Sequence, residues 1–160
     1  MKRLALALMV TLALTGCVTT YNVSEKRYDT IGNAFTTYEQ IFHRDWLVEM
    51  FVRKWVRDSG ETWYTVQIQY SGGSWLFIPG NVLIELDDST VIQTADASPS
   101  RIVRGAGGVM ETISAPIEAD QLKAMAESTT LRIQYFADPA VISPTGIDLL
   151  SRFVDEHVRQ

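Results

Sequence analysis

Apolar and polar residues alternate most regularly over residues 62–70, where Tyr64, Val66, Ile68 and Tyr70 share one side and Trp63 begins the other. A period of two is typical of an antiparallel strand with one buried face. Shorter apolar runs bounded by Gly, Pro, Asp or Ser predict further strands. The predicted strands are 46–57, 62–70, 74–78, 82–86, 90–94, 101–104, 109–117 and 130–136.

Three other segments show apolar residues at helical spacing. They are residues 30–42, 118–128 and 145–158, and in the last Thr145 with Asp148 has the spacing of a capping box. A series of short strands followed by strand, helix, strand and helix predicts an α+β fold. We expect a twisted antiparallel sheet, a meander that curls into a partial barrel or sandwich, with one or two helices late in the chain.

The chain begins with Lys2 and Arg3 followed by an apolar run over residues 4–14. This is the layout of a secretory signal. At about 1.5 Å per residue the run is too short to cross a bilayer core of roughly 30 Å. The chain therefore divides into a signal peptide over 1–16, a polar tether over 17–29 and a single β-rich α+β domain over 30–160.

The signal ends in the sequence Leu14-Thr15-Gly16-Cys17, which resembles the lipobox of bacterial lipoproteins. The resemblance implies cleavage between Gly16 and Cys17 and acylation of Cys17, and two or more acyl chains give stable membrane attachment. Because Val18 is not Asp, it also implies sorting to the outer membrane, with the domain facing the periplasm. The alternative is ordinary cleavage that leaves a soluble secreted protein with a free thiol.

The overall charge limits the classes of partner that we expect. With 14 basic and 19 acidic residues the formal net charge is −5, and loss of Lys2 and Arg3 with the signal makes it more negative. An acidic domain has no general attraction for nucleic acid or anionic lipid. Cys17 is the only cysteine, so an acylated protein would have no thiol for catalysis or metal binding.

No catalytic, cofactor or metal motif is present in the sequence. His43 and His157 lack partners at metal-ligand spacing, and the acidic group at Glu85, Asp87 and Asp88 lacks the pattern of a calcium loop. The glycine-rich segments at 72–73 and 105–108 are typical of hairpin turns and lack the residues of a phosphate-binding loop. We therefore expect no enzyme activity, no cofactor and no metal, although a hydrolase site built from scattered polar residues is an alternative.

Four residues of the first strands suggest an interaction surface: Arg53, Trp55, Arg57 and Trp63. If the tryptophans lie on the solvent face with the two arginines, they form a basic aromatic patch, and Trp and Arg are enriched in protein–protein hot spots. Alternatively, the rings fill the second face of the sheet beneath a helix. The leading hypothesis is a membrane-anchored, non-enzymatic binding or accessory module for an envelope protein or component. The alternative is a protein that binds a small ligand or a glycan.

Overall fold

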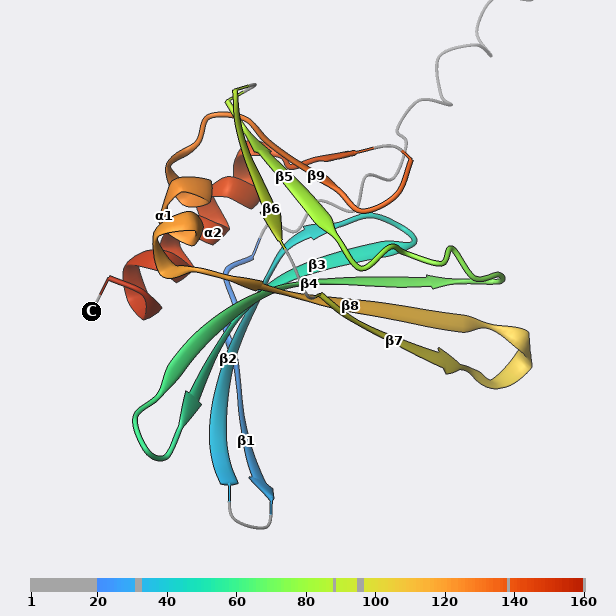
Figure 1. Cartoon of the computed structure of the whole chain (residues 1–160), viewed down its shortest axis with the longest axis horizontal. Helices are drawn as coiled ribbons and strands as arrows, with labels where there is room; N and C mark the ends of the chain where they lie inside the picture. Colours follow the sequence, from blue (N-terminus) through green and yellow to red (C-terminus); the bar gives the residue numbers. More distant parts are fainter. Residues whose placement is uncertain (1–19, 31–32, 88, 95–96, 138, 160) are drawn as a thin grey trace, which may run out of the picture.

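The computed structural model describes residues 20–30, 33–87, 89–94, 97–137 and 139–159. Its larger sheet has the strand order β1-β2-β3-β4-β8-β7, and every neighbouring pair is antiparallel. The sheet curls along its length, with the β1–β2 hairpin at one edge (Figure 1). Its strands are β1 Ser24–Thr30, β2 Asn33–Arg44, β3 Val48–Arg57, β4 Thr62–Gly72, β7 Ser98–Val103 and β8 Val109–Ile117.

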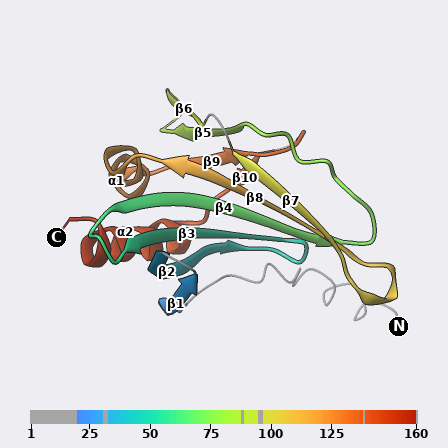
Figure 2. The same cartoon turned by 60° about the horizontal axis from the view of Figure 1, so that its bottom comes forward.

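A second, smaller sheet lies over the first (Figure 2). Its strand order is β10-β9-β5-β6, again antiparallel throughout. These strands are β5 Val82–Leu86, β6 Thr90–Thr94, β9 Leu131–Gln134 and β10 Ala140–Val141. Two helices, α1 Ala119–Glu127 and α2 Pro144–His157, lie side by side next to the small sheet, and a short 3-10 turn, η1 Gly105–Gly107, connects β7 to β8. The predicted α+β class, with a curled antiparallel sheet and late helices, is confirmed.

The core lies between the facing sides of the two sheets and the two helices. Alternate residues of each strand enter it, as the period-two pattern requires. Its fully buried members include Val66, Ile68, Ile113 and Ala115 from the large sheet, Ile84, Leu131 and Ile133 from the small sheet, and Leu122, Met125, Leu150 and Phe153 from the helices.

Helix α2 packs closely on β2 because Gly146 has no side chain. A Cβ atom at Gly146 would lie 2.3 Å from the carbonyl oxygen of Phe42 and 2.8 Å from Cγ2 of Ile142. The helix begins after Ser143, whose Oγ accepts a hydrogen bond from the Gly146 N–H at 3.1 Å. The predicted capping box at Thr145 is therefore wrong by two residues: Pro144 is the first residue of the helix, the position where its missing N–H does no harm.

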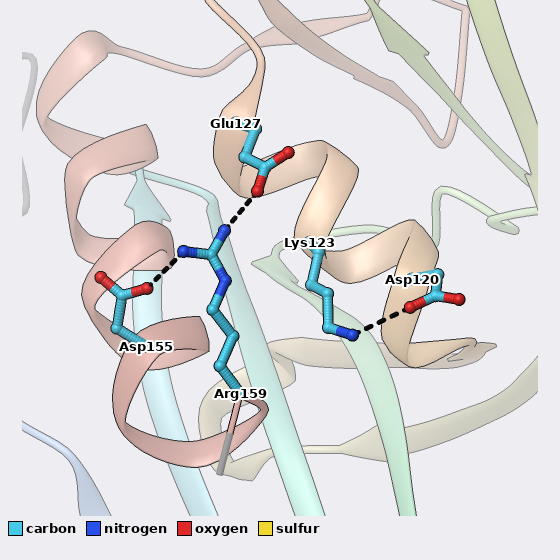
Figure 3. Close-up of polar contacts among 5 residues, drawn as sticks. All are labelled: Asp120, Lys123, Glu127, Asp155 and Arg159. Atoms are coloured by element: carbon cyan, nitrogen blue, oxygen red, sulfur yellow. Dashed lines mark hydrogen bonds and ion pairs between the residues drawn. The ribbon is translucent and has the colours of Figure 1, made fainter.

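Charged side chains join the two helices at their exposed ends (Figure 3). The Arg159 guanidinium donates from Nη1 to Asp155 at 2.8 Å and from Nη2 to Glu127 of α1. On α1 itself, Lys123 pairs with Asp120 at 2.9 Å. Exposed pairs of this kind contribute little individually, so the helix pair depends mainly on its buried apolar residues.

The predicted tether is shorter than expected. Ser24–Thr30 forms β1 and pairs along its whole length with β2. Ahead of it, the Tyr21 hydroxyl donates to Glu156 at 2.7 Å, and the Asn22 N–H donates to the side-chain oxygen of Gln40 at 2.9 Å. From Tyr21 onward the chain is therefore docked on the domain.

The predicted helix over 30–42 is wrong, because Asn33–Arg44 forms strand β2. Side chains on both faces of this strand pack against other residues. Phe35 stacks with neighbouring rings on one face, and Tyr38 stacks on His157 of α2 on the other. A strand with side chains packed on both faces shows no simple alternation. Pairing with β1 and β3 then overrides the helical spacing of its apolar residues.

The predicted strand over 74–78 is also wrong, since these residues belong to the loop between β4 and β5. Their backbone is held by the carboxylate of Glu111 on β8, which is 2% exposed. It accepts hydrogen bonds from the N–H groups of Leu76, Phe77 (2.9 Å) and Ile78 (3.1 Å). The loop therefore satisfies its donors with a side chain instead of a neighbouring strand.

Candidate interaction surface

Four aromatic rings form a continuous row across strands β1 to β4. Tyr28 stacks on Phe35 at 5.2 Å between ring centroids, and Phe35 contacts Trp55 at 5.3 Å. Trp55 then stacks on Trp63 at 5.7 Å with only 4° between the ring planes. Offset stacking at these separations is favourable beyond the burial of area alone. We call this row the aromatic ladder.

The β3–β4 turn sets the register of the ladder. The turn contains Asp58-Ser59-Gly60, and Gly60 adopts a φ of 90°, in the left-handed region that glycine tolerates best. The Gly60 N–H donates to the Arg57 carbonyl at 2.8 Å, closing the turn. With this turn, Trp55 lies directly opposite Trp63.

Two guanidinium groups cover the tryptophan rings. Arg53 lies over Trp55 at 5.2 Å from the ring centroid, and Arg57 lies over Trp63 at 5.4 Å. The Trp55 indole N–H donates to the Thr65 hydroxyl at 3.2 Å. The structure thus brings together all of the sequence-predicted patch, and each ring is held by a stacked neighbour and a cation.

The two arginines that lie over the tryptophan rings are already paired with carboxylates. Arg53 forms an ion pair with Glu39 on β2, and Arg57 with Glu61 just beyond the turn. At the outer strand, Arg27 pairs with Asp58 at 2.9 Å. The predicted basic patch is therefore a patch of paired charges, and it offers little net positive potential to an acidic partner.

The ladder lies on the face of the large sheet opposite the helices. The residues on the other face near these strands contact α2: Lys54 donates to the His157 carbonyl at 2.7 Å, and Tyr38 stacks on the His157 ring. Because side chains alternate along a strand, Trp55 and Trp63 point away from α2. Of the two helices in the described part of the chain, neither covers these two rings, which differs from the alternative drawn from the sequence. Three of the rings are half-buried, and Tyr28 at the edge is 40% exposed.

The sequence did not reveal Tyr28 and Phe35 as ladder members. Tyr28 fell in the predicted tether and Phe35 in the predicted helix, so neither was assigned to a strand. The other two tryptophans lie elsewhere: Trp46 is 86% exposed in the β2–β3 turn, and Trp75 packs against the core from the loop after β4. Gly16 and Cys17, predicted for cleavage and lipid attachment, lie outside the described residues.

The two histidines lie in partly buried surroundings. Burial lowers the pKa of His43, partly opposed by Asp45, and burial together with the charge of Lys54 lowers the pKa of His157. Over the part of the chain that the structure describes, no three His, Cys, Asp or Glu side chains are grouped as metal ligands. Within the same residues, neither helix is long and apolar enough to cross a membrane.

Comparisons with protein-family models, with curated proteins and with solved structures gave no match to this chain.

Proposed function

We propose that this protein is a lipid-anchored protein of the cell envelope that acts as a non-enzymatic binding module, with the aromatic ladder as its contact surface for a partner protein. The observation that carries the proposal is the ladder itself, a row of rings and guanidinium groups on a sheet face that the helices do not cover. Trp, Tyr and Arg are the residues that most often dominate protein–protein binding energy.

The rigidity of the ladder supports this role. Its tryptophan rings are fixed by cross-strand stacking, by the Trp55–Thr65 hydrogen bond and by the overlying arginines. A surface whose side chains are already ordered loses little conformational entropy on binding. Because its arginines are paired with carboxylates, the ladder suits a partner surface of mixed polarity.

The anchor completes the proposal. Acylation of Cys17 would hold the domain at the outer membrane, facing the periplasm, and the chain is already docked on the domain at Tyr21. The four residue-to-residue steps from Cys17 to Tyr21 reach at most about 14 Å when extended. In this reading the domain is kept close to the lipid surface. A Cys17→Ser variant should accumulate as an uncleaved precursor without lipid; mature, membrane-bound protein from that variant would contradict the anchor.

Site-specific photocrosslinking in the native envelope tests the contact surface. A photoreactive phenylalanine analogue replaces Tyr28, which is 40% exposed, or as the matched control Val103, which is 72% exposed on the opposite edge strand β7. Irradiation should give a discrete adduct from position 28 and none from position 103.

A second substitution identifies the ladder as the cause of that adduct. Trp63→Ala should abolish the adduct from position 28 while the protein stays folded by circular dichroism, and Trp46→Ala should leave it unchanged. Equal adducts from both positions, or an adduct that survives Trp63→Ala, would contradict the proposed surface.

A further inference from the structure

A cavity of about 270 Å³ opens on the outer side of the small sheet, away from the ladder. Leu83 on β5 and Gln134 on β9 lie opposite each other in register and form its floor. Their chain neighbours Ile84 and Ile133 are fully buried in the core, so Leu83 and Gln134 face outward. The cavity is lined by Phe77, Pro79, Asn81, Leu83, Gln134, Tyr135 and Phe136.

The loop that forms one wall is held in an unusual conformation. Phe77 has a φ of 56°, a value uncommon for a bulky residue, and the residue is 65% exposed. Glu111 accepts hydrogen bonds from the N–H groups on both sides of this residue, and the Arg101 guanidinium lies 5.5 Å from the centre of the Phe77 ring. Backbone strain that the surroundings maintain is often found at binding sites. Here it keeps an aromatic ring exposed at the rim of the cavity.

The lining combines three aromatic rings with two carboxamides, Asn81 and Gln134, and carries no Asp, Glu, Lys, Arg or His. An ionised ligand would find no opposite charge among the lining residues, and the nearby Arg101 is already paired with Glu111. A purely apolar ligand would cover both carboxamides without offering hydrogen bonds, which is unfavourable. A ligand with hydroxyl groups and apolar C–H faces satisfies both kinds of lining, because carboxamides donate and accept hydrogen bonds and rings pack on the C–H faces.

We propose that this cavity binds a neutral saccharide. The cavity has the volume of about nine water molecules, at roughly 30 Å³ each, which suits one or two sugar rings. It is open to the surface, so a longer saccharide can extend out of it. The cavity shares no residue with the aromatic ladder, so saccharide binding can be tested independently of the proposed protein contact.

Saturation-transfer NMR on the full lipidated protein in lipid nanodiscs tests the proposal. The probes are the neutral tetrasaccharides of N-acetylglucosamine, β-1,4-linked glucose and α-1,4-linked glucose, beside anionic tetragalacturonate and the apolar alcohol 1-naphthol. At least one neutral tetrasaccharide should show saturation of its ring C–H protons, and tetragalacturonate and 1-naphthol should not compete with it. No saturation of any neutral probe, or displacement by either comparison probe, would overturn the proposal.

Substitutions then assign the binding to the cavity. Phe77→Ala and Gln134→Ala should each weaken saccharide binding by roughly three- to tenfold, as expected for the loss of one ring contact or hydrogen bond. Gln93→Ala is the matched control, because Gln93 is an exposed glutamine opposite Leu83 on β6 that does not line the cavity.

The same variants separate this proposal from the ladder. Trp63→Ala should leave saccharide binding unchanged, and Gln134→Ala should leave the crosslink from position 28 unchanged. Saccharide binding that persists in both cavity variants would place the site elsewhere and refute the inference.

Discussion

Replacement of Glu111 by Gln tests how the loop between β4 and β5 is held. Glu111 is 2% exposed, and each of its carboxylate oxygens accepts two hydrogen bonds. One oxygen accepts from the N–H groups of Leu76 and Phe77, and the other accepts from Ile78 at 3.1 Å and from Nε of Arg101 at 3.3 Å. A carboxamide of the same shape can accept at only one of these positions, so its NH₂ group must face two donors.

The expected loss of stability follows from those two donors. The Ile78 residue is buried, and a buried N–H left without a partner costs about 1–3 kcal/mol. The Arg101 side chain is 39% exposed and can turn to water, so losing its charged partner adds no more than about 1 kcal/mol. Glu111→Gln should therefore lower the free energy of unfolding by about 1–4 kcal/mol, which moves a urea midpoint down by roughly 0.5–2 M.

The stability lost on replacing Glu111 by Gln should become smaller as the pH falls. Burial by itself raises the pKa of Glu111, but the hydrogen bonds from Phe77, Ile78, Leu76 and Arg101 outweigh it, and the pKa lies below its ordinary value. A carboxyl whose pKa is lowered on folding stabilises the protein above its unfolded pKa of about 4.3, and this contribution is lost as the pH falls through the folded value. The stability difference between wild type and Glu111→Gln should thus be largest near neutral pH and shrink below about pH 4.

Urea unfolding of both proteins between pH 3 and pH 7, followed by circular dichroism, measures this difference. Titration of His43 and His157 affects both proteins equally and cancels. Glu25→Gln is the matched control, since Glu25 is an exposed residue of β1 and its replacement should change stability by no more than about 0.5 kcal/mol. A Glu111→Gln protein as stable as the control at pH 7, or a difference that grows in acid, would refute the reasoning.

Two further substitutions test the ladder and the helix packing. Trp63→Ala removes the stacked contact with Trp55 and the cation–π contact with Arg57, and should lower the free energy of unfolding by about 1–3 kcal/mol. Trp46→Ala is the control and should be nearly neutral, because Trp46 is 86% exposed. Equal shifts of the melting temperature in the two variants would contradict a stabilising ladder. Gly146→Ala introduces a Cβ against the Phe42 carbonyl and should destabilise by roughly 1–3 kcal/mol despite the better helix propensity of alanine. Gly73→Ala, with nothing within 4 Å of the new Cβ, is its control in the same denaturation assay, and the packing argument fails if the two variants melt together.

The sequence predicts those elements that bury one face. Strands 62–70 and 109–117 and the hairpin over 82–94 have clear alternation or turn residues, and β4, β8, β5 and β6 lie there. The helices over 118–128 and near the C-terminus are also confirmed to within a few residues. In each case one side packs on the core and the other does not, so the periodicity is visible.

Prediction fails where the partner is not local. Residues 74–78 are apolar enough for a strand, but a carboxylate more than thirty residues later binds their N–H groups. Residues 33–44 pack on both faces, and residues 24–30 are polar edge-strand residues that resemble a linker. The ladder was therefore found only in its β3–β4 half, where a turn fixes the register. The cavity was not predicted, because its lining comes from two segments that are distant in the sequence and meet only in the folded protein.

The packing of α2 on β2 also determines at what stage of folding the core can be completed. Tyr21 and Glu156, which form a hydrogen bond, are 135 residues apart, and the helix that covers the inner face of β2 is the last element of the chain. Contacts of such long sequence separation form late and slow the rate-limiting step of folding. A chain that appears N-terminus first can form the β1-β2-β3-β4 part of the large sheet, but it cannot complete its core until residues 144–157 follow. Until residues 144–157 have been delivered, the inner face of β2 stays uncovered and the domain stays open.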